Sequence, residues 1–170
     1  EDVFSLLVWH EEGLGDQIQF ARFAREAALV GRRVTLMCPP QLARLFQSLE
    51  VEVIPTEGRV DIPRHDAWVM LCSLPLRLGT TLETLVGRAY LPGRPGGQGV
   101  GIMTQGNQEQ DYLAHRTLPP EMAAALAQAL PGAISLAPED TGAKDFQDTA
   151  DIIARLDLVV TIDTAVAHLA

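Results

Sequence analysis

The sequence predicts an α/β protein made of two successive units, each with a parallel sheet. Short continuous apolar runs are typical of strands buried on both faces. They alternate with amphipathic helical patterns along the 170 residues, of which 47% are hydrophobic and 21% charged. A glycine- and proline-rich stretch interrupts this alternation. We therefore expect a first unit at 1–90, a linker at 91–99 and a second unit at 100–170, each doubly wound.

The first unit begins with the apolar run FSLLVW and turns helical from Asp16, where apolar residues recur mostly every three or four positions until Gly31. A proline opens the second helix, as is common at that position. A turn-rich segment, TEGRVDIPRHD, precedes the last strand. The expected strands are 4–9, 33–38, 51–56 and 67–72, and the second helix is 40–49.

The second unit restarts after the linker with the apolar run VGIMTQ and contains one alanine-rich helix. Asp148 is suited to cap a later helix, with Asp151 in its first turn. The expected strands are 100–105, 133–138 and 157–162. The expected helices are 119–130, 148–156 and one that begins at 163.

Ligands of doubly wound sheets bind outside the carboxyl ends of the strands. Three loops are expected there, and all are rich in Gly, Asn, Asp, Thr and His: 10–16, 104–116 and 162–164.

The first of these loops contains Gly13, Gly15 and Asp16. A dinucleotide fingerprint needs another glycine where Ile18 stands, and a P-loop needs lysine where Asp16 stands, so both motifs fail. The glycines allow positive φ and close approach of a ligand. Asp16 is expected either to cap the helix or to face a substrate hydroxyl, and spacing alone favours the cap.

The third loop, in TIDTAVAHLA, contains Asp163 and Thr164 where a buried strand ends and a helix starts. A helix start can hold a phosphate. Asp163 would repel one unless its carboxylate caps the helix or binds a sugar hydroxyl. His168 follows Thr164 by one helical turn, where a histidine is more often a core group than a ligand.

The middle loop contains a Gly106-Asn107 turn and Arg116. Arginine suits bidentate phosphate contact, although an exposed loop arginine is the commoner case. The chain has no Ser-His-Asp set, and the paired carboxylates Glu11/Glu12 and Glu139/Asp140 are placed in plain loops, so a hydrolase is not supported.

Composition narrows the partners and the compartment. A net charge of -9 argues against nucleic acid or an anionic membrane as the main partner. Cys38 and Cys72 are expected to be buried hydrophobes, and no metal-ligand spacing occurs. With neither an apolar run long enough to span a membrane nor a signal peptide, a cytoplasmic protein is expected.

Several stretches together resemble the glycosyltransferase region of bacterial tetratricopeptide-repeat proteins related to the ADP-heptose:lipopolysaccharide heptosyltransferases. They are LLVWHEEGLGDQIQFARFA, SLPLRLGTTLETL, YLPG, the GN…D…HRTL pattern and DFQDTADIIARLDLVVTIDTAVAHLA. The resemblance covers nearly the whole chain, and the last stretch is the most specific.

The resemblance implies a GT-B fold of two Rossmann-like domains and transfer of a sugar from a nucleotide-sugar donor to a hydroxyl of a glycan or protein. It implies that Asp16 is the general base, beside Gly13 and Gly15 on the acceptor side. No cofactor or metal is implied. The donor-binding residues would be Gly106, Asn107, Arg116, Asp163, Thr164 and His168.

The family continues beyond AHLA and often has repeats upstream, so the second unit is expected to be incomplete. An unfinished sheet edge would favour a homo-oligomer. A non-catalytic binding or assembly module that keeps the fold is the alternative. A nucleotide-binding oxidoreductase is excluded by the failed fingerprint.

Overall fold

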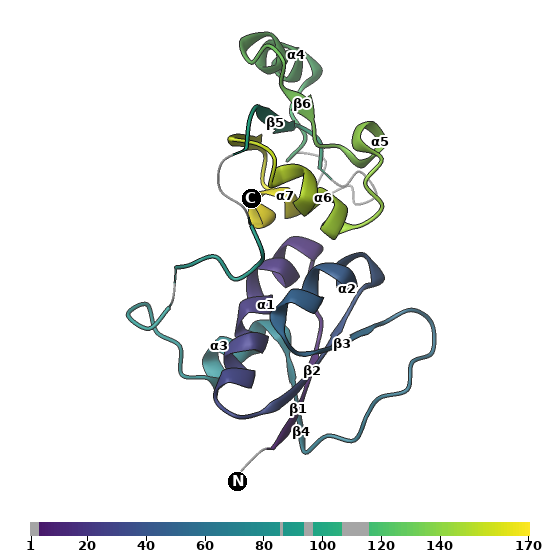
Figure 1. Ribbon diagram of the computed structural model, residues 1–170, viewed down its shortest axis with the longest axis vertical. Helices are drawn as coiled ribbons and strands as arrows, with labels where there is room; N and C mark the ends of the chain where they lie inside the picture. Colours follow the sequence, from purple (N-terminus) through teal and green to yellow (C-terminus); the bar gives the residue numbers. More distant parts are fainter. Residues whose placement is uncertain (1–3, 86, 94–96, 107–115) are drawn as a thin grey trace. The chain divides into compact units, whose positions relative to one another are not determined.

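The computed structural model describes residues 4–85, 87–93, 97–106 and 116–170. The chain forms two compact units, Glu1–Pro92 and Gly93–Ala170. Both contain parallel strands, most of them connected through helices, which confirms the α/β class and the parallel sheets (Figure 1).

The described part of unit 1 contains a four-stranded parallel sheet in the order β3-β2-β1-β4. Each strand lies within or matches an apolar run recognised in the sequence. The strands are β1 (Ser5–Trp9), β2 (Arg33–Cys38), β3 (Glu52–Pro55) and β4 (Ala67–Met70). Because β1 and β2 are central and apolar, nearly all of their side chains are buried.

The core of unit 1 forms where α1 (Leu14–Leu29) and α2 (Pro40–Phe46) pack against the sheet, side by side in Figure 1. Ile18 of α1, Leu36 of β2 and Phe46 of α2 are all 0% exposed. Full burial of such a side chain contributes about 1.5–3 kcal/mol.

The segment after β4 differs from expectation. The strand expected at 67–72 ends at Met70, and the chain continues as a 3₁₀ turn, η2 (Leu71–Ser73), and a short helix, α3 (Leu74–Arg77). A similar turn, η1 (Gln47–Leu49), follows α2. Leu71 and Leu74 are buried, so the apolar run after Met70 packs against α1 instead of extending the sheet.

Tyr90 ties the end of unit 1 to α1. Its hydroxyl donates to the carbonyl oxygen of Ile18 at 2.5 Å, and the Arg22 guanidinium lies 4.4 Å from its ring centroid. Burial raises the pKa of the Tyr90 hydroxyl, which keeps it protonated as the donor.

The described part of unit 2 has a three-stranded parallel sheet in the order β6-β5-β7. Its strands are β5 (Val100–Met103), β6 (Ile134–Ser135) and β7 (Leu158–Thr161). Its helices are α4 (Pro120–Ala129), α5 (Pro138–Thr141), α6 (Phe146–Ile153) and α7 (Ala165–Leu169). Glu139 and Asp140 lie in α5, so their assignment to a plain loop is wrong.

The cap expected at Asp148 is also wrong. Helix α6 is capped by Asp145, whose carboxylate accepts from the backbone N–H of Asp148 at 3.0 Å. The Asp148 carboxylate in turn accepts from the N–H of Lys144 at 3.0 Å. The two aspartates thus satisfy two backbone donors reciprocally, and the helix starts two residues earlier than predicted.

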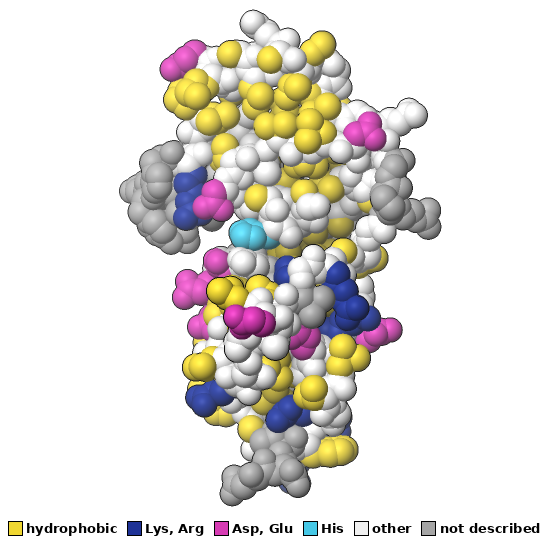
Figure 2. All heavy atoms as spheres, turned by 90° about the vertical axis from the view of Figure 1, so that its left-hand side faces the viewer, with side chains coloured by type: hydrophobic (Ala, Val, Ile, Leu, Met, Phe, Trp, Pro, Cys, Tyr) yellow, Lys and Arg dark blue, Asp and Glu magenta, His cyan; other side chains and the backbone are white. Residues whose placement is uncertain are grey.

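Unit 2 leaves much of its apolar surface in contact with water. No residue of α4 is buried, and Met122, Ile134 and Leu158 are 54%, 45% and 49% exposed. Figure 2 shows hydrophobic side chains gathered around α4, at the top of the view. An exposed apolar surface of this kind is typical of a protein–protein contact.

Candidate functional site

The strand ends of unit 2 bring two of the three expected loops together. Because β5 and β7 pair in parallel, their carboxyl ends share one edge, and the N–H of Ile162 donates to the carbonyl oxygen of Met103 at 3.1 Å. This bond continues the pairing past Thr161 and places Asp163 and Thr164 beside the loop that follows β5.

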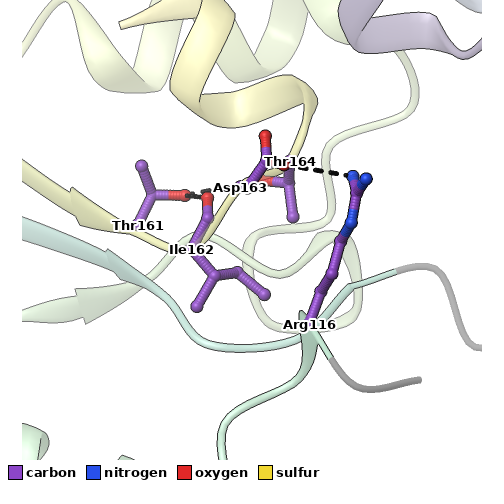
Figure 3. A network of polar contacts seen from close by, with 5 residues as sticks. All are labelled: Arg116, Thr161, Ile162, Asp163 and Thr164. Carbon is purple, nitrogen blue, oxygen red and sulfur yellow. Dashed lines mark hydrogen bonds and ion pairs between the residues drawn. The ribbon is translucent and has the colours of Figure 1, made fainter. Parts of the chain in front are cut away.

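Arg116 and Asp163 form the centre of this candidate site. The Arg116 Nη1 and Asp163 Oδ2 atoms are 3.3 Å apart, with side chains 41% and 69% exposed (Figure 3). An ion pair this exposed contributes little to stability, about 0–1 kcal/mol. Arg116 can therefore leave the Asp163 carboxylate and bind a ligand anion at a small cost in free energy. The released carboxylate can then accept a hydrogen bond from a hydroxyl group.

Thr164 immediately precedes α7. It is the N-cap, with extended backbone, so Asp163 does not cap this helix. Its Oγ1 lies 3.4 Å from Thr161 Oγ1, which donates to the carbonyl of Ile162 at 2.8 Å (Figure 3). Because the helix has only 5 residues, its dipole is weak and Arg116 supplies most of the positive charge.

Hydrogen bonds between the two ends of the middle loop hold Gly106 close to the residues that follow Arg116. The N–H of Gly106 donates to Thr117 Oγ1 at 3.1 Å, and the N–H of Leu118 donates to the carbonyl of Thr104 at 2.9 Å. Asn107 lies outside the described residues. His168 lies in the last turn of α7 and is half-buried.

Asp16 belongs to unit 1 and does not cap its helix. The N-cap of α1 is Gly13, with φ of -71°, and Asp16 is the third residue of the helix, exposed in its first turn. The preference for a capping Asp16 is therefore wrong. Its Oδ2 would lie 3.3 Å from a Cβ at position 13, so glycine gives this carboxylate room.

The positive φ that Gly13 and Gly15 would allow occurs instead at another residue of the loop. Glu12 has φ of 60°, whereas Gly13 is extended and Gly15 is helical. The backbone carbonyl of Glu12 accepts from Gln17 Nε2 at 3.1 Å, which holds the loop against α1. The Gln17 Oε1 atom is buried with no hydrogen-bond partner in the described part of the chain.

His10 is a residue that the sequence interpretation missed. Its Nε2 lies 2.9 Å from Thr56 Oγ1, and that hydroxyl lies 3.1 Å from the carbonyl oxygen of Cys38. Because the hydroxyl has one proton and Cys38 can only accept it, the geometry favours His10 with a proton on Nε2 and a free lone pair on Nδ1. Burial lowers the pKa of His10 and favours this neutral form.

Glu11 also has a role that its loop position did not suggest. Its Oε1 accepts from the backbone N–H of Cys72 at 2.9 Å, which links the end of β1 to the turn after β4. Burial and the nearby carboxylates raise the pKa of the Cys72 thiol to about 11. Cys72 is half-buried, so its expected full burial is wrong, whereas Cys38 is buried with its pKa raised to about 12.

The two groups of candidate residues thus belong to different units: Asp16 with His10 and Glu11 to unit 1, and Arg116 with Asp163 and Thr164 to unit 2. The described residues contain no group of three or more His, Cys, Asp or Glu side chains arranged to hold a metal ion. Within the same residues no helix has the length and apolarity needed to cross a membrane.

Comparison of the chain with protein-family models, with curated proteins and with solved structures finds no match.

Proposed function

We propose that the chain is a glycosyltransferase, or a part of one, with a GT-B arrangement in which unit 2 binds a nucleotide-sugar donor and unit 1 the acceptor hydroxyl. The observation that carries this proposal is the exposed Arg116–Asp163 pair at the carboxyl ends of β5 and β7. The family resemblance of the surrounding motifs supports the same reading.

In this proposal the donor diphosphate takes Arg116 from Asp163. The guanidinium can make two parallel hydrogen bonds to phosphate oxygens, and it stabilises the negative charge that builds on the leaving diphosphate. Asp163, once released, accepts a hydrogen bond from a hydroxyl group of the donor sugar or ribose. Thr164 offers its hydroxyl and the backbone amides that follow it.

Asp16 is proposed as the general base toward the acceptor hydroxyl. Its exposed position in the first turn of α1, with no side chain at Gly13 to crowd it, leaves the carboxylate accessible. The base removes the proton as the hydroxyl oxygen attacks the anomeric carbon, and the bond to the diphosphate breaks. His10 lies in the same loop and offers a second acceptor through Nδ1.

Calorimetry with a panel of nucleotide sugars tests the donor side. Arg116→Gln is expected to weaken the best donor about tenfold, since a hydrogen bond to a charged group contributes about 1.5–3 kcal/mol and this one is partly exposed. Thr164→Val should weaken it less. The control is Arg155→Gln, an exposed arginine of the same unit outside the candidate site. Equal affinity of Arg116→Gln and Arg155→Gln would remove this loop from the site.

The acceptor side is tested by transfer. Asp16→Ala should lose most transfer while binding the donor as wild type does, because the base acts only on the acceptor. Retained turnover in this variant would overturn the base assignment.

The alternative is a non-catalytic GT-B-like module for binding or assembly. The observation that favours it is the exposed apolar surface of unit 2, with Met122, Ile134 and Leu158 about half exposed. Sedimentation would decide its oligomeric part, because a self-associating module should form dimers that Ile134→Lys disrupts. Donor binding without transfer to any acceptor would support this alternative over the enzyme.

A further inference from the structure

A cavity lies in unit 1, at the opposite end of the sheet from Asp16 and His10. Its volume is about 770 Å³, and its lining includes Phe4, Arg33, Ile62, Arg64, His65 and Asp66. We call it the amino-end pocket. Ser5 and Arg33 are the first residues of β1 and β2, and Asp66 immediately precedes β4. Because the strands are parallel, these residues share the edge formed by their amino ends.

The one carboxylate among the lining residues is already engaged by the backbone. Asp66 Oδ2 accepts from the N–H of Ser5 at 2.7 Å and from its hydroxyl at 2.8 Å. These bonds, with a smaller contribution from Arg33, lower the pKa of Asp66. The Asp66 carboxylate therefore connects the start of β1 to the start of β4, and these hydrogen bonds partly offset its negative charge.

The cationic groups of the pocket are much less engaged. Arg33 Nη2 lies 3.5 Å from the carbonyl oxygen of Arg64, which is a weak contact. The Arg64 side chain makes no hydrogen bond or ion pair with any described residue. His65 Nδ1 donates to the Pro63 carbonyl at 2.9 Å, which leaves Nε2 available to a ligand. The side chains of Arg33, Arg64 and His65 are all exposed.

Two large apolar side chains stand next to these groups. Phe4 is 70% exposed and Ile62 is 47% exposed, although both line the cavity. An inorganic anion would satisfy the arginines but leave this apolar surface in water. The ligand that fits both features has carboxylates and apolar side chains alternating along its length.

Charge selects the class of that ligand further. The whole chain has a net charge of -9, so a nucleic acid or an anionic membrane would be repelled around this small cationic area. A short acidic segment contacts only the pocket, so the charge that acts on it is mainly that of the pocket residues. The exposure of the lining residues also suits an extended segment that lies across an open pocket better than a small molecule, which needs enclosure.

We propose that the amino-end pocket is a docking site for an acidic peptide segment of a partner protein. Its carboxylates pair with Arg33 and Arg64, and an apolar side chain of the segment packs on Phe4 and Ile62. This site is independent of the proposed glycosyl transfer, because every residue in it lies at the other end of the sheet from Asp16.

Fluorescence anisotropy on the full 170-residue chain tests the proposal. The probe is a labelled short peptide with phenylalanine and leucine between glutamates, and the matched probe has glutamine at each glutamate. Arg64→Gln should weaken the acidic peptide about threefold, and Arg33→Gln/Arg64→Gln together about tenfold, as expected for exposed ion pairs. Ile62→Ser should weaken it comparably. Arg59→Gln, an exposed arginine of the same segment outside the pocket lining, is the control and should bind as wild type does.

Three results would overturn the proposal. The first is no binding of the acidic peptide at low salt, where such pairs are strongest. The second is equal binding of the acidic and glutamine peptides, or equal effects of Arg64→Gln and Arg59→Gln. The third is displacement of the peptide by inorganic phosphate or an alkyl phosphate that saturates the pocket at a lower concentration than the peptide does. This result would assign the pocket to a small phosphorylated ligand. Because the substituted side chains are exposed, unchanged circular dichroism should accompany each variant.

Discussion

Gly101→Ala tests how unit 2 supports its candidate site. Gly101 lies in β5, the central strand of that sheet, and is buried. A Cβ there would lie 2.6 Å from Leu156 Cδ1 and 2.9 Å from Leu136 Cδ1. Ordinary contact needs 3.4–4 Å, so both leucines would have to move away from the strand.

The size of the effect follows from two opposing terms. Overpacking of this kind costs about 1–3 kcal/mol. Replacing glycine by alanine also stabilises by about 0.4–1 kcal/mol, because the unfolded chain loses freedom. Since the leucine ends can rotate, we expect a net loss of about 1–2 kcal/mol. Gly97→Ala should cost more, because its Cβ would lie 2.2 Å from the backbone carbon of Arg155, which cannot rotate away.

Amide hydrogen exchange of β5 and its neighbours is the assay. The N–H groups of Leu136 and Ile162, which bond to carbonyls of β5, should exchange faster by roughly tenfold for each 1.4 kcal/mol lost. The control is Gly93→Ala, where an added Cβ meets nothing within 4 Å. If Gly101→Ala protects these amides as well as Gly93→Ala does, the packing account of β5 is wrong.

Three further predictions concern unit 1. Tyr90→Phe should lower the free energy of unfolding by about 1 kcal/mol through loss of the bond to Ile18, and denaturation followed by the fluorescence of Trp9 and Trp68 measures it. Glu50→Gly should stabilise by up to about 1 kcal/mol, because Glu50 has φ of 59°; Glu50→Ala, which keeps that strain, should not. Because burial lowers the pKa of folded His10, the unfolded chain takes up the proton first below about pH 6.5, so stability should fall as the pH falls through that value. His10→Gln should flatten this part of the stability profile measured by urea titration, and an unchanged slope would contradict the burial of the ring.

The strands of unit 1 could be predicted closely because their apolar runs are strong local signals. The run RVTLMC is a strand over the predicted residues, and its side chains from Val34 to Cys38 are all buried. The apolar run AWVMLC, by contrast, ends as a strand at Met70, and the chain then turns into η2 and α3. A continuous apolar run does not by itself distinguish a strand from a buried turn, and contact with α1 decided between them here.

The caps show a second limit. Asp16 and Asp148 were both suited by type and position to begin a helix, yet Gly13 and Asp145 do so. Cap assignment changes with a shift of two or three residues in the helix start, and sequence periodicity does not set that start so finely. The consequence at Asp16 matters for function, because a carboxylate that does not cap the helix is available to a ligand.

The candidate site divides in the same way. The sequence alone identified the loops that follow β1, β5 and β7 and chose Arg116, Asp163 and Thr164 within them, because parallel strands place their carboxyl ends on one edge. The pairing of Arg116 with Asp163, and of His10 with Thr56, joins residues 47 and 46 positions apart. No local pattern encodes such contacts.

The sequence by itself therefore determined the alternation of strands and helices, the parallel sheets and the last residues of β1 and β2, Trp9 and Cys38. These depend on hydrophobic periodicity and turn chemistry, which act over a few neighbouring residues. Only the tertiary structure decided which distant groups meet: the Glu11 carboxylate and the amide of Cys72, the Tyr90 hydroxyl and the carbonyl of Ile18, and the Arg33 guanidinium and the carbonyl of Arg64. The physical reason is that hydrogen bonds and ion pairs act over a few ångströms in space, and folding brings those atoms together from distant positions in the chain.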